Sequence, residues 1–294
     1  MSDLRTILYD DSSRQYKIDP DWQGTIPYWL TPERLVTVAV GANAPVVVPL
    51  PLRHDGIFRG EYILIRPTGD FVMVMSGDGG YRFNNNDVPV FGPLIASQLA
   101  GRPFVLPEAI MLDFNRMVSM LITDTSGAPN NFNIALPGLL YLPVRFGTGQ
   151  LVKRLQTEQE RYNWLRPHWA APDGNGLGIS VPNVAGGGQI DFQITIDQTG
   201  FFEVSKIGLA AATGSALTNI SMRLFEPGDR SLSQFQMHAA LWGGTAEYPY
   251  IIPVKWGLMP NSMVRGTLFN TGVVAQTVYL ALIGRRLLGN VQTV

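Results

Sequence analysis

The feature that most constrains this chain is an internal repeat. Pro103-Phe-Val-Leu-Pro107 reappears as Pro249-Tyr-Ile-Ile-Pro253, and the two segments then run in step without a gap to the end of the second copy. Any two β segments share alternation, but alternation alone does not place prolines, an asparagine and a glycine at one spacing. The repeat therefore indicates a duplicated domain. The coinciding pairs include Leu112 with Leu258, Asn115 with Asn261, Met117 with Met263, Val118 with Val264, Thr125 with Thr271, Ala135 with Ala281, Leu136 with Leu282 and Gly138 with Gly284.

The correspondence extends upstream with small slips. The matched segments are predicted to be Val46, Val48 and Leu50 with Phe192, Ile194 and Ile196; Ile63 and Ile65 with Ile207 and Leu209; and Phe71–Met75 with Ile220–Leu224.

Each copy consists of short runs with period-two alternation, separated by clusters of Gly, Pro, Asn and Asp, a pattern typical of β-sandwiches. About eight strands per copy predict a jelly roll. The predicted fold class is all-β, with two tandem duplicated β-sandwich domains. Strands of the first copy are predicted near residues 35–40, 45–52, 61–66, 71–76, 90–97, 104–112, 117–124 and 132–143.

Two segments lie outside the copies. Residues 1–32 are polar with interspersed aromatic residues and lack either period, so we expect an extended N-terminal arm that wraps its own domain or docks into a neighbour. Thr148 to Trp169 is the one plausible long helix, and it ends at Pro167. The predicted boundaries are 1–32 for the arm, 33–147 for the first sandwich, 148–180 for a helical connector with its loop, and 181–294 for the second sandwich.

Turn chemistry predicts the ends of several strands. Gly77–Gly80 and Asn84–Asp87 are expected to be loop tips. Asn115 and Asn261 each precede a Met-Val strand start, where an asparagine can turn the chain.

The composition favours a protein whose surface is covered by partners. The 294 residues are 46% hydrophobic and only 15% charged, whereas ordinary domains carry about 25% charged residues. A net charge of −1 and the lack of a basic run argue against direct binding of nucleic acid. The N-terminus shows no signal peptide, and no apolar run is long enough for a membrane helix.

No residue pattern signals chemistry. The chain has no cysteine, which excludes disulfides and thiolate sites. Its three histidines, His54, His168 and His238, lack the spacing of a metal pair and are expected on surfaces or loops. Asp78 with Asn84–Asp87 could supply oxygen ligands to calcium, but a solvated loop is the favoured interpretation. We therefore expect no cofactor, no metal and no catalytic residue, and we do not expect an enzyme.

The aromatic residues of the arm and connector are the candidate contacts with partners. For the cluster Asn163–Trp169, which contains His168, packing between the domains is favoured over stacking on a sugar or a partner. The rival hypothesis is a carbohydrate- or receptor-binding module whose platform contains Trp164, Trp169 and Trp242. The candidate interface residues are Tyr16, Trp22, Tyr28, Trp29, Trp164 and Trp169.

The end of the second copy carries a resemblance to a known class of proteins. It reads Pro249-Tyr-Ile-Ile-Pro-Val-Lys-Trp-Gly-Leu-Met-Pro-Asn-Ser-Met-Val-Arg-Gly-Thr-Leu-Phe-Asn-Thr-Gly, then Val278-Tyr-Leu-Ala-Leu-Ile-Gly-Arg-Arg-Leu287. This resembles the closing strands of virion structural proteins from tailed bacteriophages. The length and duplicated plan are also similar to those of double jelly-roll viral capsid proteins.

The resemblance implies a β-rich component of the capsid, neck or tail, present in many symmetric copies. The predicted function is thus a structural component located in the virion, contacting other copies of itself and other virion proteins. Deleting residues 1–32 is predicted to leave both sandwiches folded and to abolish assembly.

Overall fold

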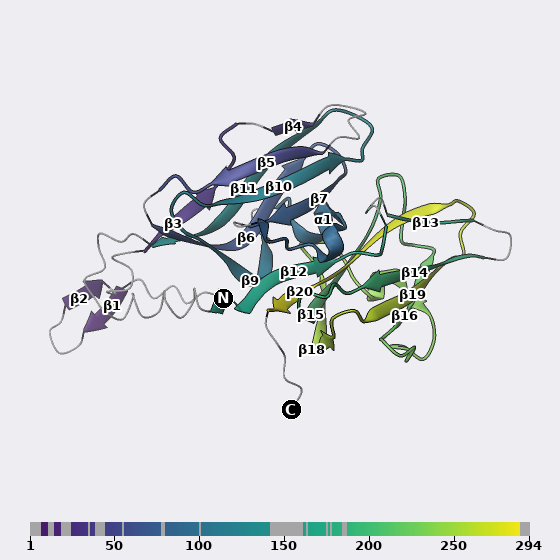
Figure 1. Cartoon of the computed structure of the whole chain (residues 1–294). Coiled ribbons are helices and arrows are strands. Elements are labelled where there is room, and N and C mark those ends of the chain that lie inside the picture. Colours follow the sequence, from purple (N-terminus) through teal and green to yellow (C-terminus); the bar gives the residue numbers. More distant parts are fainter. Residues whose placement is uncertain are drawn as a thin grey trace.

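Two jelly-roll units of the same topology make up most of the protein (Figure 1). The computed structural model describes residues 7–10, 15–18, 25–34, 36–38, 45–54, 56–77, 80–99, 101–141, 161–162, 164–174, 176, 178–183 and 187–288, with side chains from residue 26 onward. The regular structure of this part is almost all antiparallel strand, which confirms the predicted fold class. Near the N-terminus, β1 (Ile7–Asp10) and β2 (Gln15–Ile18) pair as a separate hairpin.

The first unit has two sheets, with strand orders β5-β10-β7-β8 and β3-β11-β6-β9; β4 also pairs with β11. The first strands, β3 and β4, pair with the last strand, β11, and β5 pairs with the last but one, β10, which is the jelly-roll arrangement. The elements are β3 (Thr25–Leu30), β4 (Val36–Val38), β5 (Val46–Pro51), β6 (Ile57–Pro67), β7 (Phe71–Ser76), η3 (Asn85–Asp87), β8 (Val90–Phe91), α1 (Gly92–Ile95), β9 (Phe104–Leu112), β10 (Met117–Asp124) and β11 (Asn130–Tyr141).

The second unit repeats this plan strand by strand, with orders β14-β19-β16-β17 and β12-β20-β15-β18; β13 also pairs with β20. The duplication read from the sequence is therefore a duplication of topology. The elements are β12 (Leu165–Ala170), β13 (Ile179–Val181), β14 (Gly188–Thr195), β15 (Phe201–Ala211), β16 (Ile220–Phe225), β17 (Met237–His238), η5 (Ala239–Leu241), β18 (Tyr250–Leu258), β19 (Met263–Asn270) and β20 (Gln276–Leu287).

The repeat begins earlier than the sequence suggested, so the predicted arm and connector are both too long. β3 lies inside the predicted arm, yet it pairs with β11 from Thr25 to Leu30. β12 and β13 lie inside the predicted connector, yet both pair with β20. Of the predicted helix at residues 148–169, residues 161, 162 and 164 are helical, residues 165–169 belong to strand β12, and residues 148–160 lie outside the described part. Pro27-Tyr-Trp-Leu30 and Pro167-His-Trp-Ala170 occupy equivalent positions, a match too short to stand out in the sequence.

Two details of the predicted strands also need correction. Leu50 is opposite Val118 and Ile194 is opposite Val264, so Leu50 is equivalent to Ile194. The predicted match of Leu50 with Ile196 is therefore wrong by two residues. Alternation has a period of two and cannot detect such a shift. Within the predicted strand at residues 90–97, residues 92–95 form the short helix α1, which has a proline in its first turn.

The asparagine turns are confirmed at both predicted positions. Asn115 and Asn261 each have a φ of 60°, the left-handed conformation that asparagine tolerates better than most residues. Their backbone amides donate to equivalent carbonyls, those of Leu52 and Ile196. The repeated asparagine therefore has a structural role.

The cluster Asn84–Asp87 is not a loop tip, because Asn84 and Asn85 are buried. The amide nitrogen of Asn85 donates to the carbonyl of Thr195 at 2.7 Å, and its oxygen accepts from the backbone of Asp197 at 2.8 Å. Both partners belong to the second unit. This segment thus joins the two units, and the oxygen of Asn85 is already engaged.

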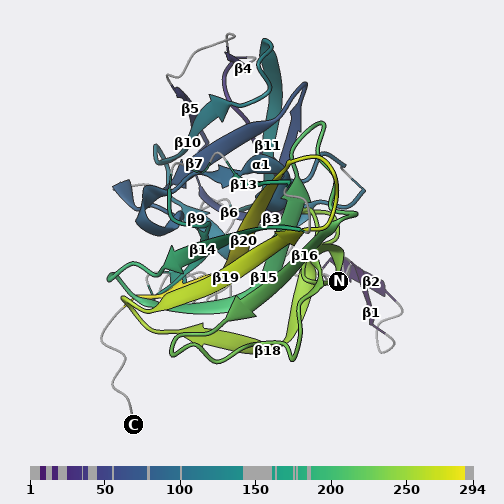
Figure 2. The ribbon, with the colours of Figure 1, turned by 90° about the vertical axis from the view of Figure 1, so that its right-hand side faces the viewer.

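The two cores meet along one strand, β20. Its side chains alternate between the core of the second unit and the seam, by which we mean the surface where the two units touch. Val278, Leu280 and Leu282 face the second core, whereas Tyr279, Ala281 and Ile283 belong to the hydrophobic cluster of the first unit. β20 is therefore buried on both faces, beneath α1 and β9 of the first unit (Figures 1 and 2).

Candidate functional site

His168 is fully buried in β12, which corrects the expectation of a surface or loop histidine. Its ring packs edge-on against Phe202, with ring centroids 4.8 Å apart, and its Nε2 lies 2.9 Å from a guanidinium nitrogen of Arg286. Burial, reinforced by the charge of Arg286, lowers the pKa of His168 well below its usual 6.5. The ring is therefore neutral at neutral pH, and its Nε2 accepts a hydrogen bond from Arg286.

The surroundings of His168 are structural. Arg286 is 4% exposed, pairs with Asp197 and donates to Thr199 Oγ1 at 2.5 Å, so its charge is compensated inside the protein. In the first unit, Tyr28 packs edge-on against Phe58 at the equivalent position, with centroids 5.9 Å apart. A ring against the core phenylalanine is thus a shared packing feature.

The other histidines do not form a reactive cluster. His238 accepts from the backbone amide of Ala240 and caps η5, while its Nε2 contacts the carbonyl of Thr218 at 2.9 Å. His54 lies near the ring of Tyr28. Within the described part of the chain, no group of three His, Asp or Glu side chains is arranged to hold a metal ion, and no helix is long and apolar enough to cross a membrane.

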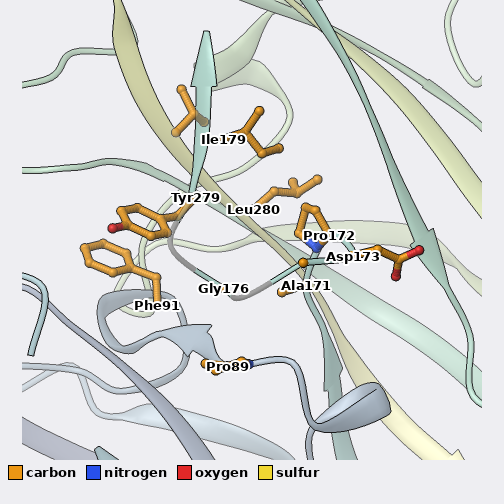
Figure 3. Close-up of a pocket in the computed structure, with 12 residues that line it drawn as sticks. Pro89, Phe91, Ala171, Pro172, Asp173, Gly176, Ile179, Tyr279 and Leu280 are labelled. Carbon is orange, nitrogen blue, oxygen red and sulfur yellow. The ribbon is translucent and has the colours of Figure 1, made fainter. Parts of the chain in front are cut away.

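A crevice lies at one end of the seam (Figure 3). Phe91 of the first unit stacks on Tyr279 of the second, with ring centroids 3.9 Å apart and planes 7° apart. Gly176 fits against the carbonyl of Pro89, where an added Cβ would lie only 2.4 Å from the oxygen. Asp173, the carboxylate among the described lining residues, accepts from the hydroxyl and amide of Thr195. The crevice is thus a tight joint whose acidic group is already hydrogen-bonded.

Polar contacts complete the joint between the units. An ion pair crosses it between Glu108 and Arg285, at 3.6 Å. Glu203, on the same sheet, pairs with Arg285 and Lys255 at 2.8 Å; burial by itself raises the pKa of Glu203, but the hydrogen bonds from these cations lower it overall. Further contacts across the seam are Ser97 and Gln98 with Glu247, Lys206 with the Val105 carbonyl, and Thr213 with Asp70.

The six predicted interface aromatics are not brought together. Trp169 is fully buried in the seam, where it contacts Phe83, so the predicted packing between the domains is confirmed for this residue. Tyr28 packs against the first core. Trp29 and Trp164 are 58% and 62% exposed. Trp22 and the side chain of Tyr16 lie outside the described residues.

A surface that the sequence analysis missed carries much of the exposed apolar area. β18, the edge strand of its sheet, is exposed along most of its length and lies at the lower edge of the second unit in both views (Figures 1 and 2). The unbroken apolar run Tyr250-Ile-Ile-Pro-Val254 was a visible signal. We call the exposed side of β18, together with Leu241 of η5, the free face; its large apolar residues are Leu241, Tyr250, Ile251 and Val254.

Comparison with known proteins does not place the chain in a family. No protein-family model and no curated protein matches it. Among solved structures, the tandem CBM22 domains of Paenibacillus barcinonensis Xyn10C align over 88% of this chain and 92% of theirs, with 8% identity and a TM-score of 0.13. A salicylate 1,2-dioxygenase from Pseudaminobacter salicylatoxidans aligns over 90% and 88%, with 7% identity and a TM-score of 0.10. At these scores neither alignment bears on fold or function.

Proposed function

We propose that this protein is a structural component of a virus particle, a bacteriophage virion protein that assembles through contacts between protein surfaces. The observation that carries the proposal is the free face. Val254 is 80% exposed and Ile251 is 67% exposed, and such large apolar side chains gathered on one surface are typical of interaction sites. The location follows from the resemblance to tailed-phage virion proteins and is part of the same proposal.

Two further observations support assembly. β18 presents an unpaired strand edge beside these apolar residues, and proteins rarely leave such an edge unprotected. The chain also has only 15% charged residues, fewer than a surface fully in contact with water usually requires. A surface covered by neighbouring subunits accounts for both.

The carbohydrate-binding alternative has less support. Of the three tryptophans expected to form a platform, Trp169 and Trp242 are buried, and the Trp242 indole donates to the carbonyl of Met222 at 3.0 Å. Trp164 alone is exposed. Sugar platforms need accessible aromatic faces, so we base no second function on these residues.

The test is the mass of the full-length chain in solution, measured by light scattering over a concentration series, with electron microscopy of the larger species. We expect discrete oligomers or concentration-driven assembly. Val254→Asp should raise the concentration needed for assembly by roughly tenfold or more, since it places a charge in an apolar interface. Val273→Asp is the matched control, because Val273 is 88% exposed outside the free face. A chain that stays monomeric at all concentrations would overturn the proposal.

A further inference from the structure

The seam shows how one unit docks on another. Leu94 of α1 lies against β15, where an added Cβ on Gly208 would be 3.2 Å from the Cβ of Leu94. The carbonyl of Pro93 accepts from the backbone amide of Ala246 at 2.8 Å, and Phe91 stacks on Tyr279. The segment from Phe91 to Leu94 therefore docks on the second unit. We call the surface that it contacts, which includes Gly208, Ala246 and Tyr279, the seat.

Because the units share one topology, each has an inserting segment and a seat, and the seam uses only one of each. The second unit's inserting segment is η5, in which Leu241 is the third residue, as Leu94 is in α1. Leu94 is fully buried, whereas Leu241 is 62% exposed. The next strand shows the same contrast, because the side chain of Glu108 is 10% exposed in the seam, whereas its equivalent Val254 is 80% exposed. The free face is thus the unpartnered counterpart of the inserting surface.

The equivalent surface of the first unit is only partly used within the described structure, because Ser97 and Gln98 contact Glu247 of the second unit while Leu99 beside them is exposed. Leu64 and Ser97 form a parallel bridge equivalent to that of Gly208 and Gly244, which makes Leu99 the counterpart of Ala246. Leu99 is 55% exposed, whereas Ala246 is 4% exposed. An open groove occupies this position, and we call it the open seat; it is lined by Leu64, Arg66, Ser97, Leu99, Asn133 and Ala135, among others.

The ion pair of the seam has no charged counterpart on the two equivalent surfaces that the seam does not use. In the seam, Glu108 of the first unit pairs with Arg285 of the second. The equivalent positions are Val254 on the free face and Leu139 on β11 of the first unit, as the matching registers of β6 with β9 and β11, and of β15 with β18 and β20, show. An ion pair has been replaced by two apolar residues, so docking would leave neither charge of that pair buried without its partner.

Two equivalent tryptophans give an independent indication that the exposed face of the first unit binds a partner. Trp29 and Trp169 lie opposite equivalent residues, Pro137 on β11 and Ile283 on β20. Trp169 is fully buried in the seam, while Trp29 stands 58% exposed on the corresponding face of the first unit. An exposed tryptophan at the position of a buried one is expected where a partner covers the surface.

We propose that the open seat of one copy binds η5 and the free face of a second copy, with Leu241 in the place of Leu94. The inference rests on the proposed function and names its partner surface. The contact is heterologous, since two different surfaces meet, so it propagates from chain to chain and either closes into a ring or extends as a filament.

Cysteine cross-linking tests the contact directly, because the chain has no cysteine of its own. Ala240→Cys and Leu99→Cys mark the equivalents of Pro93 and Ala246, whose backbones are hydrogen-bonded. Mixing the two single variants under mild oxidation should give a covalent heterodimer, with a yield roughly tenfold or more above that of Leu99→Cys mixed with Val273→Cys, because docking raises the effective concentration of the matched pair.

Complementation provides the second readout. Leu241→Asp removes the inserting surface and Leu99→Asp removes the seat, so each variant alone should require at least about tenfold more protein to assemble. Mixed, they should form one-to-one pairs that do not grow, since each supplies the surface that the other lacks. If the wild type assembles but the matched cysteines do not cross-link and Leu241→Asp assembles normally, the docking inference is wrong and the proposed function stands. A wild type that never assembles would overturn both.

Discussion

At the scale of single residues, the repeated glycines Gly138 and Gly284 have a shared cause. A Cβ on Gly138 would lie 2.1 Å from the carbonyl oxygen of Arg59, and one on Gly284 would lie 1.9 Å from that of Glu203. Each glycine lies where the register between its strand and the neighbouring strand shifts, and the contact is with backbone, which cannot move aside like a side chain. Only glycine permits this close approach of two strands.

The buried His168 gives a prediction for the dependence of stability on pH. The pKa of His168 is well below 6.5 in the folded chain, so below about pH 6.5 the unfolded chain binds one more proton at this residue than the folded chain does. The free energy of unfolding should therefore decrease as the pH is lowered below about 6.5. For this one group the decrease is about 1.4 kcal/mol per pH unit, and it ends when the pH reaches the folded pKa.

His168→Gln should remove this slope, because glutamine does not titrate and can still accept from Arg286. Urea unfolding at several values between about pH 5 and pH 7.5 would measure it. His54→Gln, at an exposed histidine, is the control and should keep the slope of the wild type. Equal slopes for His168→Gln and the wild type would show that His168 is not the group responsible.

At the scale of elements, β3 changes what an N-terminal deletion is expected to do. Removing residues 1–32 takes away β3, which pairs with β11 and carries the buried Leu30, and loss of a buried leucine alone costs about 2–5 kcal/mol. Removing only residues 1–24 leaves that pairing in place. The longer deletion should therefore be less stable by about 3 kcal/mol or more, as measured by urea unfolding. Equal stability would mean that β3 contributes little to the first unit.

The strand β20 shows a signal that comparing the two copies could have revealed. Its run Val278–Ile283 is continuously apolar, whereas the equivalent stretch of β11, Phe132–Pro137, includes the polar Asn133. Continuous apolar runs mark strands that are buried on both faces. The alternation in the first copy and its loss in the second thus indicated that, within the chain, it is the second copy whose outer face on this sheet is covered.

At the scale of the whole molecule, the two equivalent tryptophans should behave differently when mutated. Trp169→Ala should destabilise the chain by about 3–5 kcal/mol, because Trp169 is fully buried between the units. Trp29→Ala should change stability by less than about 1 kcal/mol, since its side chain is mostly exposed, but should weaken assembly. Urea unfolding measures the first effect and light scattering the second. Similar losses of stability for the two variants would contradict the inference that Trp169 lies in a surface already covered within the chain and Trp29 in an equivalent surface that is uncovered.

The seam joins the two units into one body. Tyr279, Ala281 and Ile283 of the second unit belong to the cluster that contains the core of the first, so the second unit alone would expose an apolar strand face to water. Ion pairs and hydrogen bonds cross the same boundary. The duplicated halves therefore form one body, although each has the topology of a complete jelly roll.

The sequence by itself determined the all-β class, the duplication and most strands of the first unit, including β7, β9 and β10 at the bounds the structure gives them. It did so because side-chain alternation and turn residues act locally, within a few positions along the chain. The turns at Asn115 and Asn261 were predictable for the same reason.

Only the tertiary structure decided that residues 25–30 and 165–170 are sheet strands, that His168 and Asn85 are buried, and which copy covers which. These properties depend on pairings between residues far apart in the chain, which short, weakly patterned segments do not encode locally. The difference between the buried Leu94 and the exposed Leu241 has the same origin. Equivalent residues in two copies acquire different surroundings only when one unit docks on the other.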